Sequence, residues 1–442
     1  MCDIYIYISM LFYNPRNIEV SDNEKKKIIK TLKNNKTPAL TIHIIGNEDK
    51  LKEVLNYDDK DVIYPPQYKL NEDDIFKMYN MRGQPKYKTY IKSIPKLRVN
   101  FYSDEDKIEL SKALNIKITK LTSFIHYPNK YESKSWDYKY ITKGKSKNPQ
   151  YPVYIISKGR WEQRLTQRLL EKSNIPYKIV VEPSEYDKYV EVIDEKNIIK
   201  APEDFSKLGR GGVPVRNYVW EHAVKSGASH HWVLDDNIRE FNFYNNNLRV
   251  KINNGIPLRA TEDYVKKFNN VYLSGLQYSM FVPDRSIHYP YIYNTRIFSC
   301  ILINHKLDNI LDERWRGKYN EDVDLSLRVL LKGKGTILNQ QFLISKEATL
   351  RNKGGNTDSI YGGKNDYDKI KEKALAIVKE YPTIAKLCNK YNRGIHHTLN
   401  LHQFIDNDLG YDERKEKYKK NYNYKIVKLN KSKRIKIDLK KN

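Results

Sequence analysis

The sequence predicts an α/β protein whose main domain is a mostly parallel sheet flanked by helices. From residue 151 onward, short apolar runs typical of buried strands alternate with segments of helical periodicity. This alternation favours a parallel sheet with helices on both faces. The chain has 442 residues, enough for two or three domains of about 150 residues each. Aromatic residues make up 12% of it, which excludes global disorder because such a chain can bury a core.

A small α/β region is expected ahead of that domain. The apolar run 4–13 predicts a buried strand rather than a signal peptide, since it lacks a basic leader and a small-residue cleavage site. Residues 97–102 predict a strand and residues 104–114 a helix with an acidic start, and both fall in a compact module over 96–145. The preceding residues 1–95 form a region without an assigned role.

The main domain is expected over residues 151–405, after a stretch of linker composition at 142–150. In its first half, strands are predicted at 153–157, 177–182, 198–201 and 231–234, and helices at 159–173, 184–192 and 215–226. The second half is more mixed, with strands predicted at 271–278, 297–303 and 336–345 and a helix at 321–331. Ligands of open α/β sheets bind at the carboxyl ends of the strands, so the informative residues should follow those ends.

The positive charge indicates a polyanionic partner. The chain carries 80 Lys and Arg against 54 Asp and Glu, a net charge of +26, and such residues neutralise the phosphates of nucleic acids. The basic tail 411–442 interleaves Tyr418, Tyr422 and Tyr424 with lysine, a composition that binds a phosphate backbone and stacks on bases. The alternative is a solvated basic surface with a disordered tail, because the excess is mostly lysine.

Cysteine usage and hydropathy exclude two further classes of protein. Cys2, Cys300 and Cys388 are odd in number, far apart and without a Cys-x-x-Cys pair. A disulfide scaffold is therefore excluded, and a reducing, cytoplasmic compartment fits. No apolar run approaches the roughly 20 residues needed to span a bilayer, so we expect no membrane partner.

An acidic pair follows the last strand of the alternating series. Asp235, Asp236 and Asn237 come directly after the predicted strand 231–234. Adjacent carboxylates at a buried strand end need a counter-charge, which a hard divalent cation supplies while it also binds a diphosphate. The alternative is an Asp-rich turn or a helix cap.

A second acidic pair and a late pair of histidines add chemistry to the same domain. Glu321 and Asp322 open a predicted helix, where an acid either acts as a general base or only caps the helix. His396 and His397 are adjacent, and one of them is a candidate metal ligand or phosphate contact, although lone histidines are more often structural.

Two turns carry cations next to small residues. Ser157, Lys158 and Arg160 follow the first strand of the main domain, which predicts a nucleotide contact at a strand-to-helix turn. Arg210 and Arg216 lie in and just after the glycine-rich segment LGRGGV, whose backbone can approach a ligand closely. Solvated or flexible connections are the alternatives for both turns.

The order of these motifs resembles that of a known family. SKGRW, LGRGGVPVRN, HHWVLDDN, NEDVDLSLR and RGIHH follow one another as in the TET-associated glycosyltransferases, which are GT-A-fold relatives of the base-J glucosyltransferase found widely in phages. The resemblance covers residues 153–404, somewhat over half of the chain. It implies a GT-A-like fold. Gly394 and Ile395 stand where that family is expected to have a tryptophan before the histidines.

The resemblance also implies a role for each candidate residue. Asp235 and Asp236, with Asn237, would hold a divalent metal (Mn²⁺ or Mg²⁺) and the donor, a nucleotide diphosphate sugar with UDP-glucose the first candidate. Asp322, or its neighbour Glu321, would be the catalytic base. The remaining donor contacts would come from Ser157, Lys158, Arg160, Arg210 and Arg216, and a late metal ligand from His396 or His397.

The expected function is transfer of a hexose to a hydroxymethylated pyrimidine in DNA, with inversion at the anomeric carbon. A viral enzyme of this kind would work in the cytoplasm of its host. One alternative is the same chemistry on a protein or glycan acceptor. Another is an inactive nucleic-acid-binding module, and a third is a metal-dependent nuclease.

Overall fold

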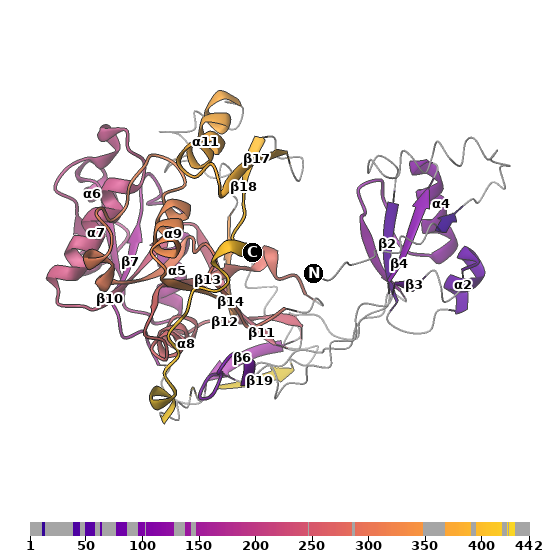
Figure 1. Cartoon of the computed structure of the whole chain (residues 1–442), viewed down its shortest axis with the longest axis horizontal. Coiled ribbons are helices and arrows are strands. Elements are labelled where there is room, and N and C mark those ends of the chain that lie inside the picture. The colour runs from indigo at the N-terminus through magenta and orange to yellow at the C-terminus, as the bar shows by residue number, and fades with distance from the viewer. Residues whose placement is uncertain are drawn as a thin grey trace. The chain divides into compact units, whose positions relative to one another are not determined.

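The computed structural model describes two compact units (Figure 1). The first unit comprises Met1–Asn71 and Ile91–Ser133, and the second comprises Glu72–Tyr90 and Lys134–Asn442. The residues described are 11–13, 39–44, 49–57, 62–63, 77–85, 96–101, 103–127, 138–142, 147–245, 247–284, 288–347, 367–389, 395–417, 422 and 424–428. All candidate site residues lie in the second unit.

The first unit is a small α/β fold. Its strands are β1 (Leu11–Tyr13), β2 (Ala39–Ile44), β3 (Val62–Ile63), β4 (Lys96–Phe101) and β5 (Phe124–Tyr127), and its helices are α2 (Asp49–Leu55) and α4 (Asp104–Leu114). The strands run in the order β1-β4-β2-β5, and β3 pairs with β4. Ser103 and Asp106 form a capping box that starts α4 where its acidic first turn predicts.

The sequence-based division at residue 95 does not describe this unit. Strands from both sides of that position pair in a single sheet, because β4 lies between β1 and β2. Leu40, Ile42, Leu97 and Val99 are fully buried in one core between these strands. The two N-terminal regions therefore fold together, although the strand and the helix predicted at 97–102 and 104–114 are found there.

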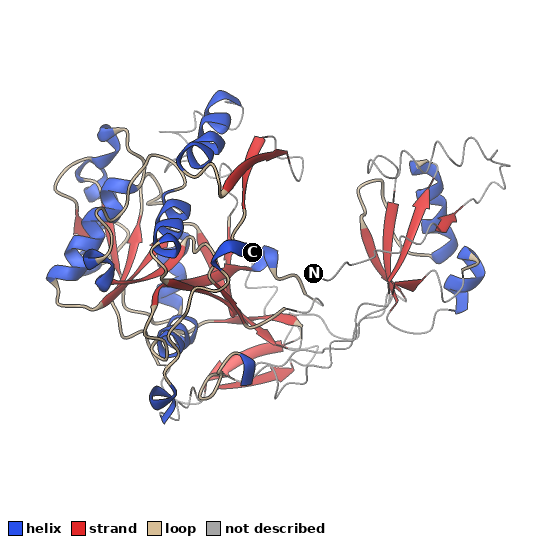
Figure 2. Cartoon of the chain, viewed as in Figure 1, coloured by secondary structure: helices blue, strands red, loops and turns tan. Residues whose placement is uncertain are grey.

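The second unit is built on a sheet of ten strands among the described residues (Figure 2). These strands are β7 (Val153–Ile156), β8 (Lys178–Val181), β9 (Ile198–Lys200), β10 (His230–Asp235), β11 (Ile238–Asn245), β12 (Leu248–Ile252), β13 (Val271–Tyr278), β14 (Tyr291–Tyr293), β15 (Cys300–Asn304) and β16 (Gly335–Lys346). Their order is β12-β11-β16-β13-β15-β10-β7-β8-β9, and β14 pairs with β16.

The sheet is mixed rather than mostly parallel. Its four strands β10, β7, β8 and β9 are parallel, as the alternation of strands and helices predicts. Beyond them, β15 pairs antiparallel with both β10 and β13, and β11 pairs antiparallel with β12 and β16. The β11–β12 turn is too short for a crossover, so these two strands can only be antiparallel. An α/β fold is thus confirmed, and its GT-A-like character stays a prediction.

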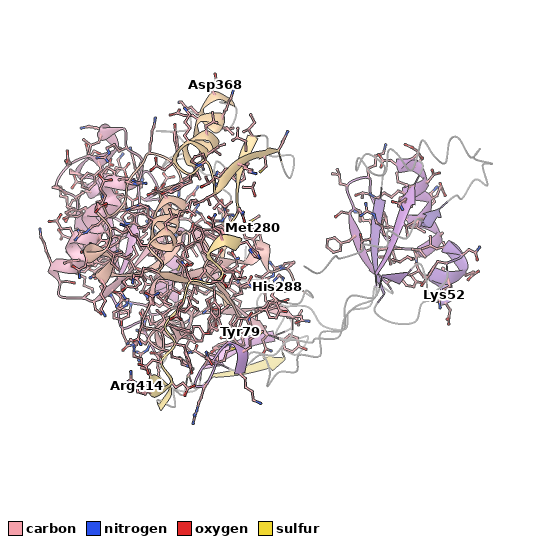
Figure 3. The ribbon with its side chains drawn as sticks, in the orientation of Figure 1. Lys52, Tyr79, Met280, His288, Asp368 and Arg414 are labelled. Carbon is pink, nitrogen blue, oxygen red and sulfur yellow. The ribbon has the colours of Figure 1, made fainter. Side chains whose placement is uncertain are left out.

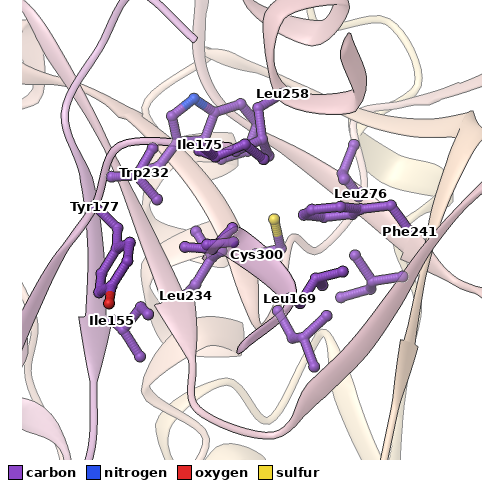
Figure 4. Close-up of a cluster of buried hydrophobic side chains, with 14 of the residues drawn as sticks. Ile155, Leu169, Ile175, Tyr177, Trp232, Leu234, Phe241, Leu258, Leu276 and Cys300 are labelled. Atoms are coloured by element: carbon purple, nitrogen blue, oxygen red, sulfur yellow. The ribbon is translucent and has the colours of Figure 1, made fainter. Parts of the chain in front are cut away.

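Helices cover both faces of this sheet. Side chains of α5 (Leu165–Lys172), α6 (Tyr186–Val190) and α8 (Ile256–Val265) pack in a core with alternate residues of β7 and β10, such as Ile155 and Leu234 (Figure 4). Side chains of α7 (Val213–Lys225) and α9 (Glu321–Leu331) pack with the residues that point the other way, such as Tyr154 and Val233. The period of two along each strand separates the two cores.

A second helical layer lies outside α9. Ile377 of α11 (Tyr367–Glu380) and Tyr381, which directly follows this helix, pack in one core with Val323 and Leu327 of α9. The hairpin β17 (Ala385–Asn389) and β18 (Ile395–Leu399) follows and carries the two histidines. Short 3-10 helices connect the larger elements: η3 (Pro183–Glu185), η4 (Glu195–Asn197), η5 (Phe205–Leu208), η6 (Ser279–Phe281), η7 (His305–Asn309), η8 (His402–Phe404) and η9 (Glu413–Lys417).

Part of the basic tail is folded into the second unit. Strand β19 (Tyr424–Lys428) pairs with β6 (Tyr138–Thr142). Tyr422 is 4% exposed, and its hydroxyl donates to Asp263 Oδ2 at 3.0 Å. The expectation of a separate tail from residue 411 is therefore wrong for these residues, because Tyr422 belongs to the same core as Tyr140 of β6 and β19 pairs with that strand.

Candidate active site

The carboxyl ends of the central strands surround one cavity of about 370 Å³. In the parallel pair β7–β10, Ile156 lies opposite Asp235, so the turns that follow both strands meet at the same edge. The predicted residues that line the cavity are Ser157, Lys158, Arg160, Arg216, Asp235, Asp236, Asn237, Glu321, Asp322, His396 and His397. Arg210 is exposed and does not line it, so the structure does not bring this residue into the site.

Asp235, the last residue of β10, accepts three hydrogen bonds. Arg216 Nη2 donates to Oδ1 at 2.8 Å, and Lys346 Nζ and Ser299 Oγ donate to Oδ2 at 2.6 and 2.7 Å. Burial acts to raise the pKa of Asp235, but Lys346 and Arg216 outweigh burial and hold this pKa well below the usual carboxyl range. Asp235 is therefore ionised at neutral pH, and its counter-charges come from Lys346 of β16 and Arg216 in the helix Val213–Lys225.

Asp236 is held by the turn that follows β7. Ser157 Oγ donates to its Oδ2 at 3.0 Å, the Tyr189 hydroxyl lies 2.7 Å from Ser157 Oγ, and Arg160 forms an ion pair with Oδ1. Burial raises the pKa of Asp236 while Arg160 opposes that rise. The predicted turn Ser157–Arg160, called the SKGR turn below, thus contacts the Asp-Asp motif, Asp235 and Asp236, directly.

Arg216 joins the Asp-Asp motif to the start of α9. Its Nε lies 3.2 Å from Glu321 Oε1, while its Nη2 contacts Asp235. A Cβ atom added to Gly212 would lie 3.3 Å from Glu321 Oε1, which explains why the glycine-rich segment can approach this pair so closely. Arg216 is 5% exposed and contacts both acids, so it positions them. Its Nη1 atom has no partner among the residues that the structure describes.

Asp322 differs from the other acids of α9. The hydrogen bond found for its carboxylate in the described part of the chain comes from the Val323 backbone N–H, at 2.8 Å. Asp324 instead accepts from Arg316, Arg328 and Tyr381, and it is 5% exposed. Burial, and then the neighbouring Glu321, raise the pKa of Asp322. A partly accessible carboxylate with a raised pKa is suited to take up a proton.

Three buried side chains that line the cavity, Arg216, Asn237 and His397, have polar atoms for which no hydrogen-bond partner is found among the described residues. His397 is 4% exposed, and within the described part of the chain neither of its ring nitrogens has a partner, nor does Asn237 Oδ1. Burial, and then His396, lower the pKa of His397 to about 4, so the ring is neutral at pH 7, as a metal ligand must be. Buried polar atoms without a partner are uncommon in folded proteins, so these atoms are candidate contacts for a bound group.

The residues present fit a divalent cation by their chemistry. Two carboxylates, an amide oxygen and a neutral imidazole are the donor types that such ions take. In the described part of the chain, no three His, Cys, Asp or Glu side chains are gathered closely enough to hold an ion. Arg160, Arg216 and Lys346 instead compensate the acids, so an ion would have to share the carboxylates with these cations.

Sequence reasoning missed several residues that line the cavity. Lys346 and Ser299 reach Asp235 only through the pairing of β16, β13, β15 and β10, which no local pattern reveals. Lys373 of α11 also lines the cavity, and burial lowers its pKa. A lysine that directly follows a long buried strand, as Lys346 follows residues 336–345, is the signal that could have found the first of them.

The fold and site define an α/β protein with a cation-rich, acid-bearing cavity at the strand ends. Residues 151–355 match the family model described as TET-Associated Glycosyltransferase. This match confirms, for that segment, the family expected from its motifs, and the family's description indicates a glycosyltransferase. His396 and His397 lie beyond the matched residues. No curated protein matches the chain. No helix among the described residues is long and apolar enough to cross a membrane.

Proposed function

We propose that the protein transfers a hexose from a nucleotide diphosphate sugar to a hydroxymethylated pyrimidine in DNA, with inversion. The observation that carries this proposal is the position of Asp322. Burial raises the pKa of this carboxylate, which lines the same cavity as Asp235 and Asp236. The cations Arg160, Arg216 and Lys346 line that cavity as well. A base beside a phosphate-binding region is what attack on an anomeric carbon requires.

The donor would lie over the ends of β7 and β8. Lys158 and Arg160 supply positive charge there, and Val180, Ala201 and Phe205 supply an apolar wall for the nucleoside. Arg216 holds Asp235 and Glu321 in place rather than meeting the phosphates directly. UDP-glucose is the first donor to test.

A divalent metal is part of the proposal. Asp235, Asp236, Asn237 and His397 would hold it, and when bound it would neutralise the diphosphate and stabilise the leaving nucleotide. His396 is the weaker candidate ligand, because it is exposed whereas His397 is buried. Transfer should therefore stop when the metal is removed with EDTA and return with Mn²⁺.

Asp322 would take the proton of the acceptor hydroxyl as its oxygen attacks the anomeric carbon. The C–O bond to the acceptor forms on the face opposite the departing diphosphate, which inverts the configuration. Glu321 is bonded to Arg216 and would orient the site rather than act as the base.

The DNA acceptor is supported by charge and by the family match. The net charge of +26 favours a polyanion, and the family is described by its association with TET. The test is to incubate the protein with Mn²⁺, labelled nucleotide sugars and DNA containing 5-hydroxymethyl-pyrimidines. Label on DNA would support the proposal. Hydrolysis of the sugar nucleotide without label on DNA would contradict DNA as the acceptor and would indicate a protein or glycan acceptor instead.

A further inference from the structure

The cavity has an aromatic end, on the other side of Asp235 from the SKGR turn. In the sheet order β8-β7-β10-β15-β13-β16, strand β10 carries Asp235 and separates the two ends. Beyond it the lining includes Tyr278 at the end of β13, Phe281 in η6 and Phe298 just before β15. Because the proposed donor would lie over the ends of β7 and β8, these aromatic side chains are available to contact the acceptor.

The three rings form a continuous wall. Tyr278 and Phe281 are stacked with centroids 5.9 Å apart and planes 26° apart, and the Tyr278 and Phe298 centroids are 4.4 Å apart. Phe281 is 46% exposed, although burial of an aromatic ring is strongly favourable. An exposed ring that lines a cavity and stacks on a second ring offers an open π-face to a ligand.

Cations lie against the same wall. Arg296 is 5.7 Å from the Phe298 centroid, and Lys346 Nζ is 5.7 Å from the Tyr278 centroid. Arg296 also lines the cavity, and since Lys346 is paired with Asp235, Arg296 is the cation that would meet a phosphate. Cations interleaved with aromatic rings are the combination by which proteins bind single-stranded nucleic acids, because each base stacks and each phosphate is neutralised. Asp322 lines the same cavity, so a ring on Phe281 would have the candidate base within the same enclosure.

We infer that Phe281, backed by Tyr278, is the stacking platform for the acceptor base after it leaves the DNA helix. A base inside a duplex cannot reach an enclosed site, so it has to be flipped out and held by stacking. This inference rests on the proposed DNA acceptor. It adds a residue that determines the acceptor and that lies outside the acidic and basic motifs.

The test compares variants of the full chain at Phe281. Phe281→Ala should raise the KM for hydroxymethylated DNA by about 5- to 150-fold, the loss expected for one stacked base. The ratio of transfer to donor hydrolysis should fall by a similar factor. Phe281→Trp should keep a low KM, and Phe281→Leu, which is apolar but not aromatic, should not.

Met280 provides the matched control. Met280, which is labelled in Figure 3, is the sequence neighbour of Phe281. It is 57% exposed and does not line the cavity. Met280→Ala should leave the KM for DNA at the wild-type value, and thermal melting would verify that all variants fold. A wild-type KM in Phe281→Ala or Phe281→Leu, or equal losses in transfer and hydrolysis, would overturn the inference alone. Failure of the wild-type protein to label DNA would contradict the DNA acceptor and therefore the proposed function itself.

Discussion

At the scale of single residues, the three acids at the start of α9 have different surroundings. Asp324 is tied to two arginines and a tyrosine, Glu321 is bonded to Arg216, and Asp322 has a raised pKa and lines the cavity. The sequence-based expectation is Asp322 as the base, with its neighbour Glu321 as the alternative. The side-chain contacts favour Asp322, because a base must be free to meet the acceptor.

Asp322→Asn is expected to lower the rate of transfer by about 10²–10⁴-fold, the usual contribution of a general base. Donor binding should persist, since the donor region lies on other strands. Asp324→Asn is the control on the same helix. It should lower the melting temperature, because it leaves buried partners unpaired, and it should retain chemistry. Rates and melting curves of the two variants would separate the roles. Equal loss of rate in both would contradict this assignment.

The pH dependence follows from the same carboxylate. Asp322 must be ionised to act, and burial and Glu321 raise its pKa while Arg216 opposes them; Lys346 and Lys373 are further charges that interact with it. Transfer should therefore fall tenfold per pH unit on the acid side, starting above the usual carboxyl pKa of about 4. The pKa of His397 is about 4, so no histidine limb is expected near pH 6.5. A pH–rate profile that falls only below pH 4 would contradict this reasoning.

At the scale of elements, the site depends on strands that are distant in sequence. Lys346 at the end of β16 and Asp235 at the end of β10 are joined by a 2.6 Å ion pair, with Ser299 between them. Both side chains are largely buried. Removal of one would therefore leave an unpaired buried charge, which lowers the free energy of unfolding. The depressed pKa of Asp235 makes this pair stabilising at neutral pH, and the stabilisation is lost as pH falls below the usual carboxyl range.

A double-mutant cycle with Asp235→Asn and Lys346→Met should show a coupling energy of about 0.5–3 kcal/mol in the free energy of unfolding. Urea denaturation at pH 7 measures it, and the coupling should shrink at low pH as Asp235 is protonated. Additive effects of the two changes at pH 7 would show that the pair contributes nothing to stability.

Local patterns predicted the elements that carry strong local signals. Strand β13 and helix α9 have the predicted bounds, and the first four strands of the main domain differ by one residue at most at each end. Helix α5 begins at Leu165 rather than at residue 159, because Gly159 and Arg164 have positive φ values of 66° and 40°. The β11–β12 hairpin was missed. Its antiparallel pairing, like the approach of Lys346 to Asp235, depends on strand order rather than on periodicity.

The candidate site, like the secondary structure, was predicted where local motifs carry the information. The motifs at strand ends and at the start of α9 do line one cavity, since the topology rule for α/β sheets applies to β7 and β10. Arg210 does not line this cavity, which the sequence could not show because a glycine-rich loop gives no information on the direction of its side chains. The aromatic wall around Phe281 was missed, since isolated aromatic residues in a sequence give no signal of a shared surface.

At the scale of the whole molecule, charge is the dominant feature. With a net charge of +26, binding to DNA should weaken with salt, with a slope of log affinity against log salt of about −0.9 for each phosphate neutralised. Deleting the tail would remove Tyr422 from the core, so charge substitutions are the better probe. Replacing Lys431, Lys433 and Arg434 with glutamine should make the slope less steep. Fluorescence anisotropy across a salt series measures the affinity for DNA and its slope. An unchanged slope would show that these tail residues do not contact DNA phosphates.

The most direct measurement is the mass of the nucleosides recovered from treated DNA. Hydroxymethylated DNA would be incubated with the sugar nucleotide, Mn²⁺ and either the wild-type protein or Asp322→Asn, then digested to nucleosides. We predict that the wild-type protein adds one hexose to the hydroxymethyl-pyrimidine nucleoside and that Asp322→Asn adds almost none. Unmodified nucleosides after treatment with folded wild-type protein and every donor tested, or equal modification by Asp322→Asn, would contradict the account.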